Sequence, residues 1–333
     1  MPALKKVIEA LGSVFRFHKL KILSLFLFAL GFFLLRFPYG DLSGFITAQV
    51  SQRSAGNAYL EFEDMNLRVF PGLGMRLSQV NLSLARSPLP ELKMASLVVA
   101  PNWLSLLRFA PGASLSAEDL WQGDLSLSVA LGGKIGDEGR RWQNIDTTYQ
   151  DFSLAQLIEA LDLPVRLGGQ GQLSAAGKLD PQFSEQPDLT INALISPLEV
   201  PAQTLQIGSP MGPIPFPLPN LSFKDVKLKG RWLDGDFIVE DMILGAPTDK
   251  INARLQGRLG LQLQRGGLGV RPAAGAYDFN LELNIHKELE KNFSVLLFID
   301  KFKKPTSTGT LYRLRVSGTR VGAPATMGKF DGF

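Results

Sequence analysis

Few side chains in this chain of 333 residues are of the types that catalyse reactions or bind metals. There are two histidines, His18 and His286, and no cysteine, so a thiol nucleophile, a thiolate metal site and a disulfide are all excluded. Asp234 and Asp236 flank Gly235, and this spacing is more typical of a hairpin turn than of an ion site. The sequence therefore predicts no catalytic residue, no metal ion and no cofactor.

Motifs that bind nucleotides or present a hydrolytic nucleophile are also missing. Gly169 and Gly171 begin a GxG pattern, but Ser174 stands where a dinucleotide-binding loop has its third glycine. The alternation around them is that of a strand and not of a helix start. The motifs GxxxxGK[ST], HExxH and GxSxG do not occur. We therefore expect a protein that is not an enzyme.

The charge distribution argues against binding to nucleic acid. The chain carries 35 Lys and Arg and 31 Asp and Glu, which gives a formal net charge of +4. Residues 1–36 hold six basic residues against Glu9, a net +5, so the remaining residues carry a net −1. Nucleic-acid binding needs basic side chains on the folded part of the protein. The six basic residues are Lys5, Lys6, Arg16, Lys19, Lys21 and Arg36.

The most apolar stretch is Ile22–Leu35, fourteen residues without a charge. As a helix it covers roughly 21 Å, less than the ~30 Å hydrocarbon core of a bilayer. A span over residues 20–39 reaches roughly 30 Å if Lys21 and Arg36 extend toward the lipid head groups. The aromatic ring of Tyr39 suits the membrane interface. The sequence therefore predicts a single-pass transmembrane anchor over residues 20–39.

Two other interpretations of this stretch remain. A cleaved signal peptide has the same order of basic and apolar regions, and the nearest cleavage site follows Ala48. A buried core helix would carry polar residues along one side, whereas Ser24 is the only polar residue in the stretch. With a retained anchor, the basic flank predicts that residues 1–19 are a cytoplasmic tail and residues 40–333 lie across the membrane.

Residues 40–333 alternate between apolar and polar side chains with the period of β-strands. Leu125, Leu127 and Val129 share one face with Asp124, Ser126 and Ser128 on the other, and the pattern recurs to the end of the chain. We predict a mainly β domain of antiparallel strands with one apolar face. The residues predicted to line a possible apolar groove on that face are Leu125, Leu127, Val129, Leu167, Leu173, Phe279, Leu281 and Leu283.

Whether that apolar face is a closed core or an open groove is not decided by the pattern. Only three short helices are predicted in this domain, over residues 41–54, 152–161 and 287–303, which favours an open groove because so little covers the strands. Residues 197–219 contain seven prolines, so we predict a polyproline II segment or loop that serves as a crossover and not a central strand.

The order of these segments resembles the N protein family of the type II secretion system, GspN, in its deltaproteobacterial form. The residues that carry the resemblance are FPYGDL at 37–42, LEFEDMNLRVFPGLGMRLSQVNLS at 60–83 and LRVSGTRVGAP at 314–324. They are similar to that family's exit from the membrane anchor, its first hairpins and its last strand. The first of these segments are also similar to the wider AsmA-like group of inner-membrane proteins.

The resemblance implies a bacterial inner-membrane protein with a periplasmic domain, accessory to protein export. It implies partners among other type II secretion components, with the domain acting as a scaffold or as a hydrophobic groove. The AsmA-like group implies a long curved antiparallel sheet whose concave side holds phospholipid acyl chains, and lipid binding or transfer outside secretion is the alternative function. The resemblance supplies no catalytic residue.

Overall fold

The computed structural model describes residues 19–54, 56–69, 72–85, 90–102, 105, 109–135, 140–207, 214–266, 269–290, 296–321 and 325–333. The predicted cytoplasmic tail lies outside these residues except for Lys19. The first helix, α2 (Lys19–Arg36), is followed by η1 (Tyr39–Leu42) and α3 (Ser43–Arg53), so the predicted helix at 41–54 is confirmed. Among the described residues, no helix combines the length and the apolar character that a membrane crossing requires.

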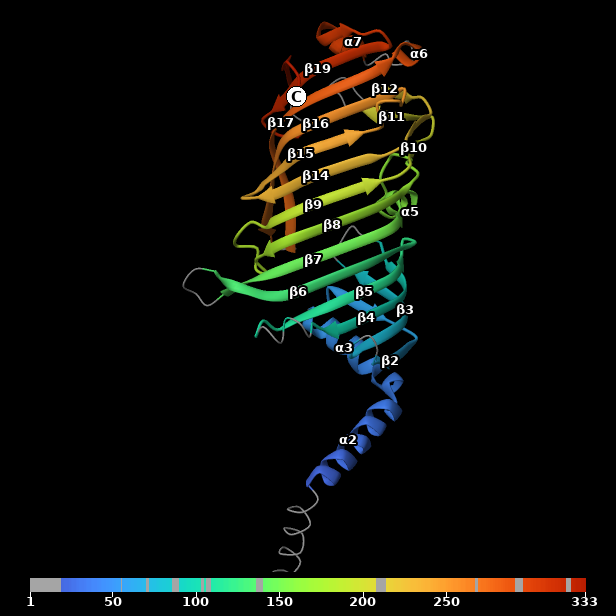
Figure 1. The fold of residues 1–333 in the computed structure, drawn as a ribbon, viewed down its shortest axis with the longest axis vertical. Helices are drawn as coiled ribbons and strands as arrows, with labels where there is room; N and C mark the ends of the chain where they lie inside the picture. The colour runs from blue at the N-terminus through green and yellow to red at the C-terminus, as the bar shows by residue number, and fades with distance from the viewer. Residues whose placement is uncertain are drawn as a thin grey trace, which may run out of the picture.

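The rest of the chain is mainly β, as predicted, and its strands form one 16-stranded antiparallel sheet in the described residues. Nearly every strand pairs with the strands before and after it, so the sheet is a meander that climbs along the long axis of the molecule (Figure 1). Its long strands are β3 (Gly74–Leu84), β4 (Leu92–Pro101), β5 (Gly112–Leu120), β6 (Gly123–Ile135), β7 (Arg140–Ser153), β8 (Gln170–Leu179), β9 (Asp188–Ile195), β14 (Val226–Leu233), β15 (Asp236–Leu244), β16 (Ile251–Gly266), β17 (Gly269–His286) and β19 (Gly309–Gly318).

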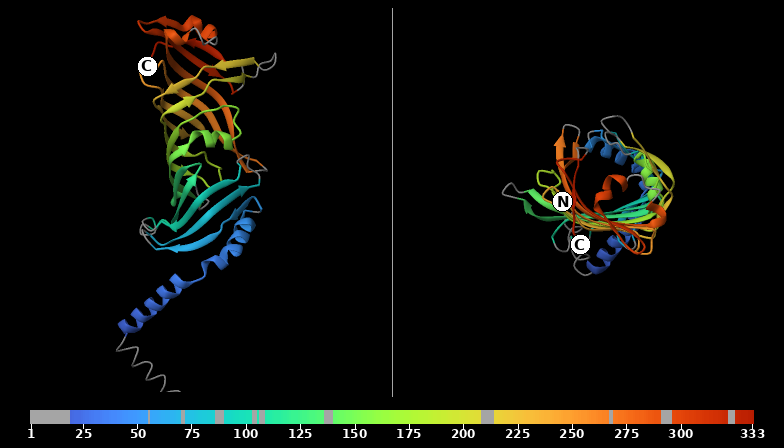
Figure 2. Two further views of the ribbon diagram at one scale, coloured as in Figure 1. Left: turned by 90° about the vertical axis from the view of Figure 1, so that its right-hand side faces the viewer. Right: turned by 90° about the horizontal axis from the view of Figure 1, so that it is seen from above.

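The sheet is strongly curved, and its helices lie over the concave side (Figure 2). α3 lies at the N-terminal end and α5 (Leu154–Ala160) near the middle. α6 (Lys287–Glu290), α7 (Leu296–Ile299) and η2 (Asp300–Phe302) lie at the C-terminal end. Seen from above, the sheet curls around the helices.

Both edges of the sheet are covered by pairs of short strands. At one edge β3 pairs with β1 (Ala58–Glu61) and β2 (Asp64–Arg68). At the other, β19 pairs with β18 (Lys303–Pro305) and β20 (Thr326–Lys329). Short edge strands leave few unpaired backbone groups, and this limits pairing with another chain. The sheet is therefore built to end at these strands.

In its described residues, the proline-rich segment forms short strands, which corrects the prediction of polyproline II or a loop over 197–219. β10 (Leu198–Val200) pairs with β13 (Leu221–Phe223), and β11 (Gln203–Ile207) pairs with β12 (Ile214–Leu218). These strands lie outside the main sheet, so the exclusion of a central strand is confirmed. β12 has only one partner, and Pro215 and Pro217 are two residues apart, so both missing N–H groups belong to the edge that faces no strand.

The segment is also an excursion and not the predicted crossover. β9 and β14, which precede and follow it, pair directly with each other. The chain leaves the sheet after β9, builds the two small hairpin-like pairs and returns to the neighbouring position. We call residues 197–223 the insertion.

Two predicted helices are shorter than expected. The helix predicted at 152–161 begins at Leu154, because β7 continues through Ser153 and the Ser153 hydroxyl then accepts a hydrogen bond from the N–H of Gln156, 3.4 Å away. In the segment predicted as a helix at 287–303, the described residues form α6, α7 and the 3₁₀ turn η2, and Lys303 already belongs to β18.

β-bulges decide which side chains reach the concave side. The register of β7 with β8 shifts between Tyr149 and Phe152, where Asp151 has a φ of 56°. Without the extra residue, positions 149 and 152 would project from opposite faces. With it, both rings lie on the same face and stack with centroids 4.5 Å apart. The Phe152 ring also lies so close to Gly171 that a Cβ there would be 2.1 Å from Cζ.

Asp180 is fully buried in the turn between β8 and β9, and its ionised form stabilises that turn. Burial raises the pKa of Asp180, but hydrogen bonds from the Ser184 hydroxyl and from the backbone N–H groups of Gln182, Glu185 and Ser184 outweigh it, so the pKa is lowered. A carboxylate whose folded-state pKa is lowered contributes stability above its unfolded pKa, and this contribution is lost as the pH falls through the folded-state value.

We expect Asp180→Asn to destabilise the protein by about 1–3 kcal/mol at pH 7, because an amide replaces one charged acceptor by a donor. The difference between wild type and variant should shrink as the pH falls below about 4, where the unfolded carboxyl is protonated. Urea midpoints of the full chain at pH 7 and pH 3 measure both effects. An unchanged difference at pH 3 would show that the charge of Asp180 does not contribute.

Candidate functional site: an apolar concave face

The apolar side chains of the sheet form continuous rows across ten strands, from β5 to β19. Residues directly opposite each other in an antiparallel pair project from the same face, so the strand register traces each row. The first row is Ala117, Leu125, Tyr149, Leu173, Ala193, Leu228, Met242, Leu255, Leu281 and Leu314. The second is Leu115, Leu127, Thr147, Ala175, Ile191, Gly230, Val239, Gly257, Phe279 and Val316.

A third row is equally apolar. It consists of Ala113, Val129, Ile145, Gly177, Leu189, Trp232, Phe237, Leu259, Tyr277 and Gly318. We call the three rows together the apolar face. Strands in a sheet are about 4.8 Å apart, so each row runs for about 40 Å along the sheet.

Three polar groups within the apolar face, those of Thr147, Trp232 and Tyr149, are bonded to backbone. The Thr147 hydroxyl donates to the carbonyl of Ser126 at 3.1 Å, and the Trp232 indole N–H donates to the carbonyl of Leu261 at 2.8 Å. The Tyr149 hydroxyl donates to the carbonyl of Leu120 at 2.5 Å, and burial raises the pKa of Tyr149 to about 12. These three groups therefore have no donor left to offer a ligand.

The helices pack against this same face, which identifies it as the concave side. Ile46 and Val50 of α3 pack against a buried cluster at the N-terminal end that includes Leu77, Leu97 and Ala117. At the C-terminal end, Leu296 and Phe302 belong to a cluster with strand residues such as Ile285, Tyr312 and Leu314. The first cluster closes the N-terminal end of the concave side, and the second extends from Leu154 and Ile158 of α5 to the C-terminal end.

Seven of the eight predicted groove residues lie on the concave side, and all eight are partly buried. Leu125 and Leu173 pack against the N-terminal cluster, and Leu281 and Leu283 against the C-terminal cluster. In the second and third rows, Leu127, Val129 and Phe279 are partly exposed and belong to neither cluster. The register brings Leu127 and Phe279 into one row although 152 positions separate them. The clusters thus cover the first row more fully than the second and third rows.

Leu167 occupies a different place from the one that its alternation suggests. β8 begins at Gln170, so Leu167 lies in the connection from α5 and not in a strand. There it lines a cavity of about 760 Å³ that α5, this connection and the insertion enclose. We call this the side cavity. Its residues come from segments that are distant in sequence, which is why the alternation pattern did not reveal it.

The convex face is polar and carries ion pairs between neighbouring strands. Arg254 Nε lies 2.7 Å from Asp241 Oδ1, Arg313 Nε lies 2.8 Å from Glu282 Oε2, and Arg231 binds both oxygens of Asp188. Exposed pairs of this kind contribute little to stability. Their effect is to keep this face in water, so the two faces of the sheet have opposite character.

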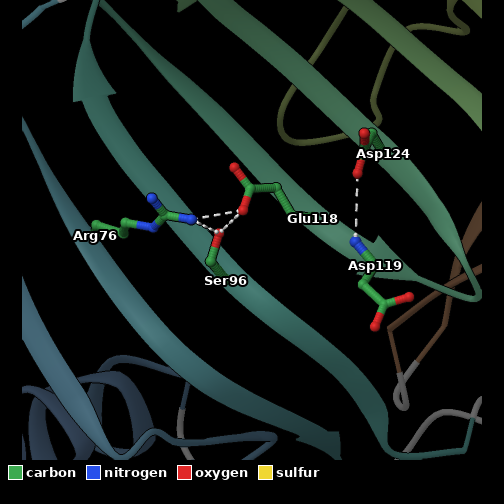
Figure 3. Close-up of polar contacts among 5 residues, drawn as sticks. All are labelled: Arg76, Ser96, Glu118, Asp119 and Asp124. Atoms are coloured by element: carbon green, nitrogen blue, oxygen red, sulfur yellow. Dashed lines mark hydrogen bonds and ion pairs between the residues drawn. The ribbon is translucent and has the colours of Figure 1, made fainter. Parts of the chain in front are cut away.

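The N-terminal part of the convex face carries a closed polar network (Figure 3). Arg76 Nη2 lies 2.6 Å from Glu118 Oε2, and the buried Ser96 hydroxyl donates to the same carboxylate oxygen at 2.6 Å. Nearby, the N–H of Asp119 donates to Asp124 at the β5–β6 turn. The Glu118 carboxylate is already paired with Arg76, so it is not a free general base that could activate the Ser96 hydroxyl as a nucleophile. The network instead connects β3, β4 and β5.

Metal-binding groups do not converge in the described part of the chain, where no cluster of three or more His, Asp or Glu side chains is placed to hold an ion. His286 ends β17 and precedes α6, apart from any such group.

No protein-family model, curated protein or solved structure matches this chain.

Proposed function

We propose that this protein binds phospholipid acyl chains along its apolar face. The observation that carries the proposal is the partly exposed apolar surface of the second and third rows, with Leu127, Val129 and Phe279 among its residues, beside the two buried clusters. Exposed apolar surface of this extent marks a binding site on a protein in water. The hydrocarbon core of a bilayer is ~30 Å thick and two acyl chains deep, so one chain occupies about 15 Å of that depth and a row of about 40 Å is long enough for an acyl chain to lie along the sheet.

The proposal includes a membrane anchor at the N-terminal end. α2 points away from the sheet, and its large apolar side chains are exposed, with Leu20 at 82% and Phe28 at 74%. A helix that is apolar on all sides requires an apolar surrounding. We propose that residues 20–39 insert into a bilayer. The insertion uses Phe37–Tyr39 beyond the end of α2, and Lys21 and Arg36 extend to the head groups.

Phe28→Asp is expected to weaken the attachment of the full chain to lipid vesicles, because a carboxylate in the middle of the apolar segment costs about 2.5–3.5 kcal/mol on insertion scales. Flotation of the purified chain with phospholipid vesicles measures the bound fraction. Phe109→Asp is the matched control, since Phe109 is a 93% exposed apolar residue of the folded domain. Equal flotation of both variants would contradict the anchor.

Localisation and partners follow from the family resemblance. The basic flank of the anchor and the resemblance to GspN support a bacterial inner-membrane protein with residues 40–333 in the periplasm. We propose that it is an accessory component of type II secretion, with the apolar face as its working surface, and that it is not an enzyme. Lipid binding or transfer in the cell envelope outside secretion, as in the AsmA-like group, is the alternative. A strain that lacks this protein distinguishes the two functions: a loss of type II export would favour the secretion role, and unchanged export would favour the lipid-binding alternative.

The acyl-chain proposal is tested by the lipid content of the purified full chain. After extensive washing in detergent, organic extraction and mass spectrometry should recover phospholipid in a fixed ratio to protein. A chain that is folded and free of lipid, and that takes up none on incubation with vesicles, would contradict the proposal and would favour a scaffold that only docks on other secretion components.

A further inference from the structure

The side cavity differs from the apolar face in having charged groups around an apolar floor. Ile158 of α5, Leu167 and Leu221 belong to or pack against the C-terminal cluster, so the floor is continuous with the buried core of the concave side. The rim carries Arg166 together with Glu159, Asp162 and Glu199. At about 760 Å³ the cavity is within the range of pockets that hold small molecules.

The charged groups on the rim have no partner among the described residues. The backbone of Arg166 is fixed by the side-chain amide of Gln203: the Arg166 N–H donates to Gln203 Oε1 at 2.8 Å, and the Arg166 carbonyl accepts from Gln203 Nε2 at 2.8 Å. The Arg166 guanidinium makes no ion pair with a described residue. The carboxylates of Glu159 and Glu199 likewise have no ion pair within the described residues. Rim charges of both signs are thus available to a ligand.

The backbone fixes the position of Glu199 at this rim. Gly168 and Glu199 exchange two backbone hydrogen bonds, of 2.8 Å and 2.9 Å, which tie the connection after α5 to β10. The Glu199 carboxylate lies over Gly168, since a Cβ built there would be 3.6 Å from Oε2. Glu199 is also directly opposite Ser222 in the β10–β13 pair, so both side chains project from the same face and both line the cavity.

We propose that the side cavity binds the head group of a zwitterionic aminophospholipid, of the phosphatidylethanolamine type. The guanidinium of Arg166 would pair with the phosphate, and the carboxylates of Glu199 and Glu159 with the ammonium group. The apolar floor then receives the start of an acyl chain. An anionic phospholipid offers the phosphate but no ammonium group, and it meets three carboxylates. This inference rests on the proposed function and adds a preference for one head-group class.

The test is a binding titration of the full chain in detergent with two fluorescent phospholipids that share acyl chains and differ in head group, phosphatidylethanolamine and phosphatidylglycerol. We expect the wild type to bind the ethanolamine lipid about tenfold more tightly. Glu199→Gln should remove most of this preference, and Arg166→Gln should weaken both lipids. Glu61→Gln and Arg320→Gln are matched controls on exposed residues outside the cavity and should change neither affinity.

Ser222→Trp provides an independent variant, because a large side chain on the exposed rim fills the cavity without altering a buried position. It should lower the affinity for the ethanolamine lipid while leaving the thermal midpoint unchanged. Equal affinity for both lipids, or a preference that survives Glu199→Gln and Ser222→Trp, would overturn the head-group site and leave acyl-chain binding intact. Failure of the wild type to bind either lipid would overturn both proposals.

Discussion

Replacing Leu127 with Asp is expected to abolish the binding of acyl chains while the protein remains folded. Leu127 is partly exposed in the second row of the apolar face and belongs to neither buried cluster. Water therefore reaches an aspartate at this position, and the large penalty for a buried, unpaired carboxylate does not apply. A charge within the row, however, interrupts the apolar surface that an acyl chain needs.

The measurement compares the lipid recovered from the purified full chain with its thermal midpoint. Ser126→Asp is the matched control, because Ser126 is the preceding residue of the same strand and projects from the convex face. The expected result is a loss of at least tenfold in bound lipid for Leu127→Asp and no loss for Ser126→Asp, with similar midpoints. An unfolded or degraded Leu127→Asp protein would indicate a sealed core instead of a groove.

Tyr312→Ala is expected to cause the largest loss of stability, about 3–5 kcal/mol. Tyr312 is 1% exposed and is among the largest fully buried side chains in the described residues. It lies in the C-terminal cluster with Phe302 of η2, so its removal leaves a cavity beneath the elements that close this end of the concave side. A loss of this size is a large part of a domain's total stability.

Tyr312→Phe separates packing from hydrogen bonding. The hydroxyl of Tyr312 is 3.4 Å from Glu290 Oε1, a long contact, and burial together with the nearby charges of Glu290 and Asp300 raises the pKa of Tyr312 to about 12. Removing the hydroxyl alone should cost no more than about 1 kcal/mol. Urea midpoints of the full chain in detergent measure both variants. Similar losses for Ala and Phe would show that the hydroxyl, and not the ring, stabilises this end.

The alternation of apolar and polar residues was sufficient to predict the fold class and the face on which most groove residues lie. Leu125, Leu127 and Val129 share a face because successive side chains of a strand point to opposite sides. The same rule failed where the chain inserts one residue. Nothing in the sequence around Asp151 indicates that Tyr149 and Phe152 lie on one face, because a bulge depends on the pairing partner.

A local sequence pattern also could not predict the insertion or the side cavity, because both depend on which segments pair in the folded chain. Prolines argue against strands in general, but Pro215 and Pro217 are compatible with an edge strand because only alternate N–H groups face the partner. Arg166 and Glu199 come to line the same cavity because one isolated β-bridge pairs the backbones of Gly168 and Glu199. The sequence does show a charged residue next to an apolar one at each place, Arg166 beside Leu167 and Glu199 beside Val200. Only the three-dimensional structure shows that these two charged residues lie at the same cavity.

The most direct test of the acyl-chain groove is photolabelling of the full chain with a phospholipid that carries a diazirine near the end of one acyl chain. Peptide mapping should place the adducts on the second and third rows of the apolar face, at residues such as Leu127, Val129 and Phe279. Neighbours on the convex face, Ser126 and Ser128, should remain unlabelled. Adducts confined to α2, or spread equally over both faces of the sheet, would contradict the proposal that the concave face binds acyl chains.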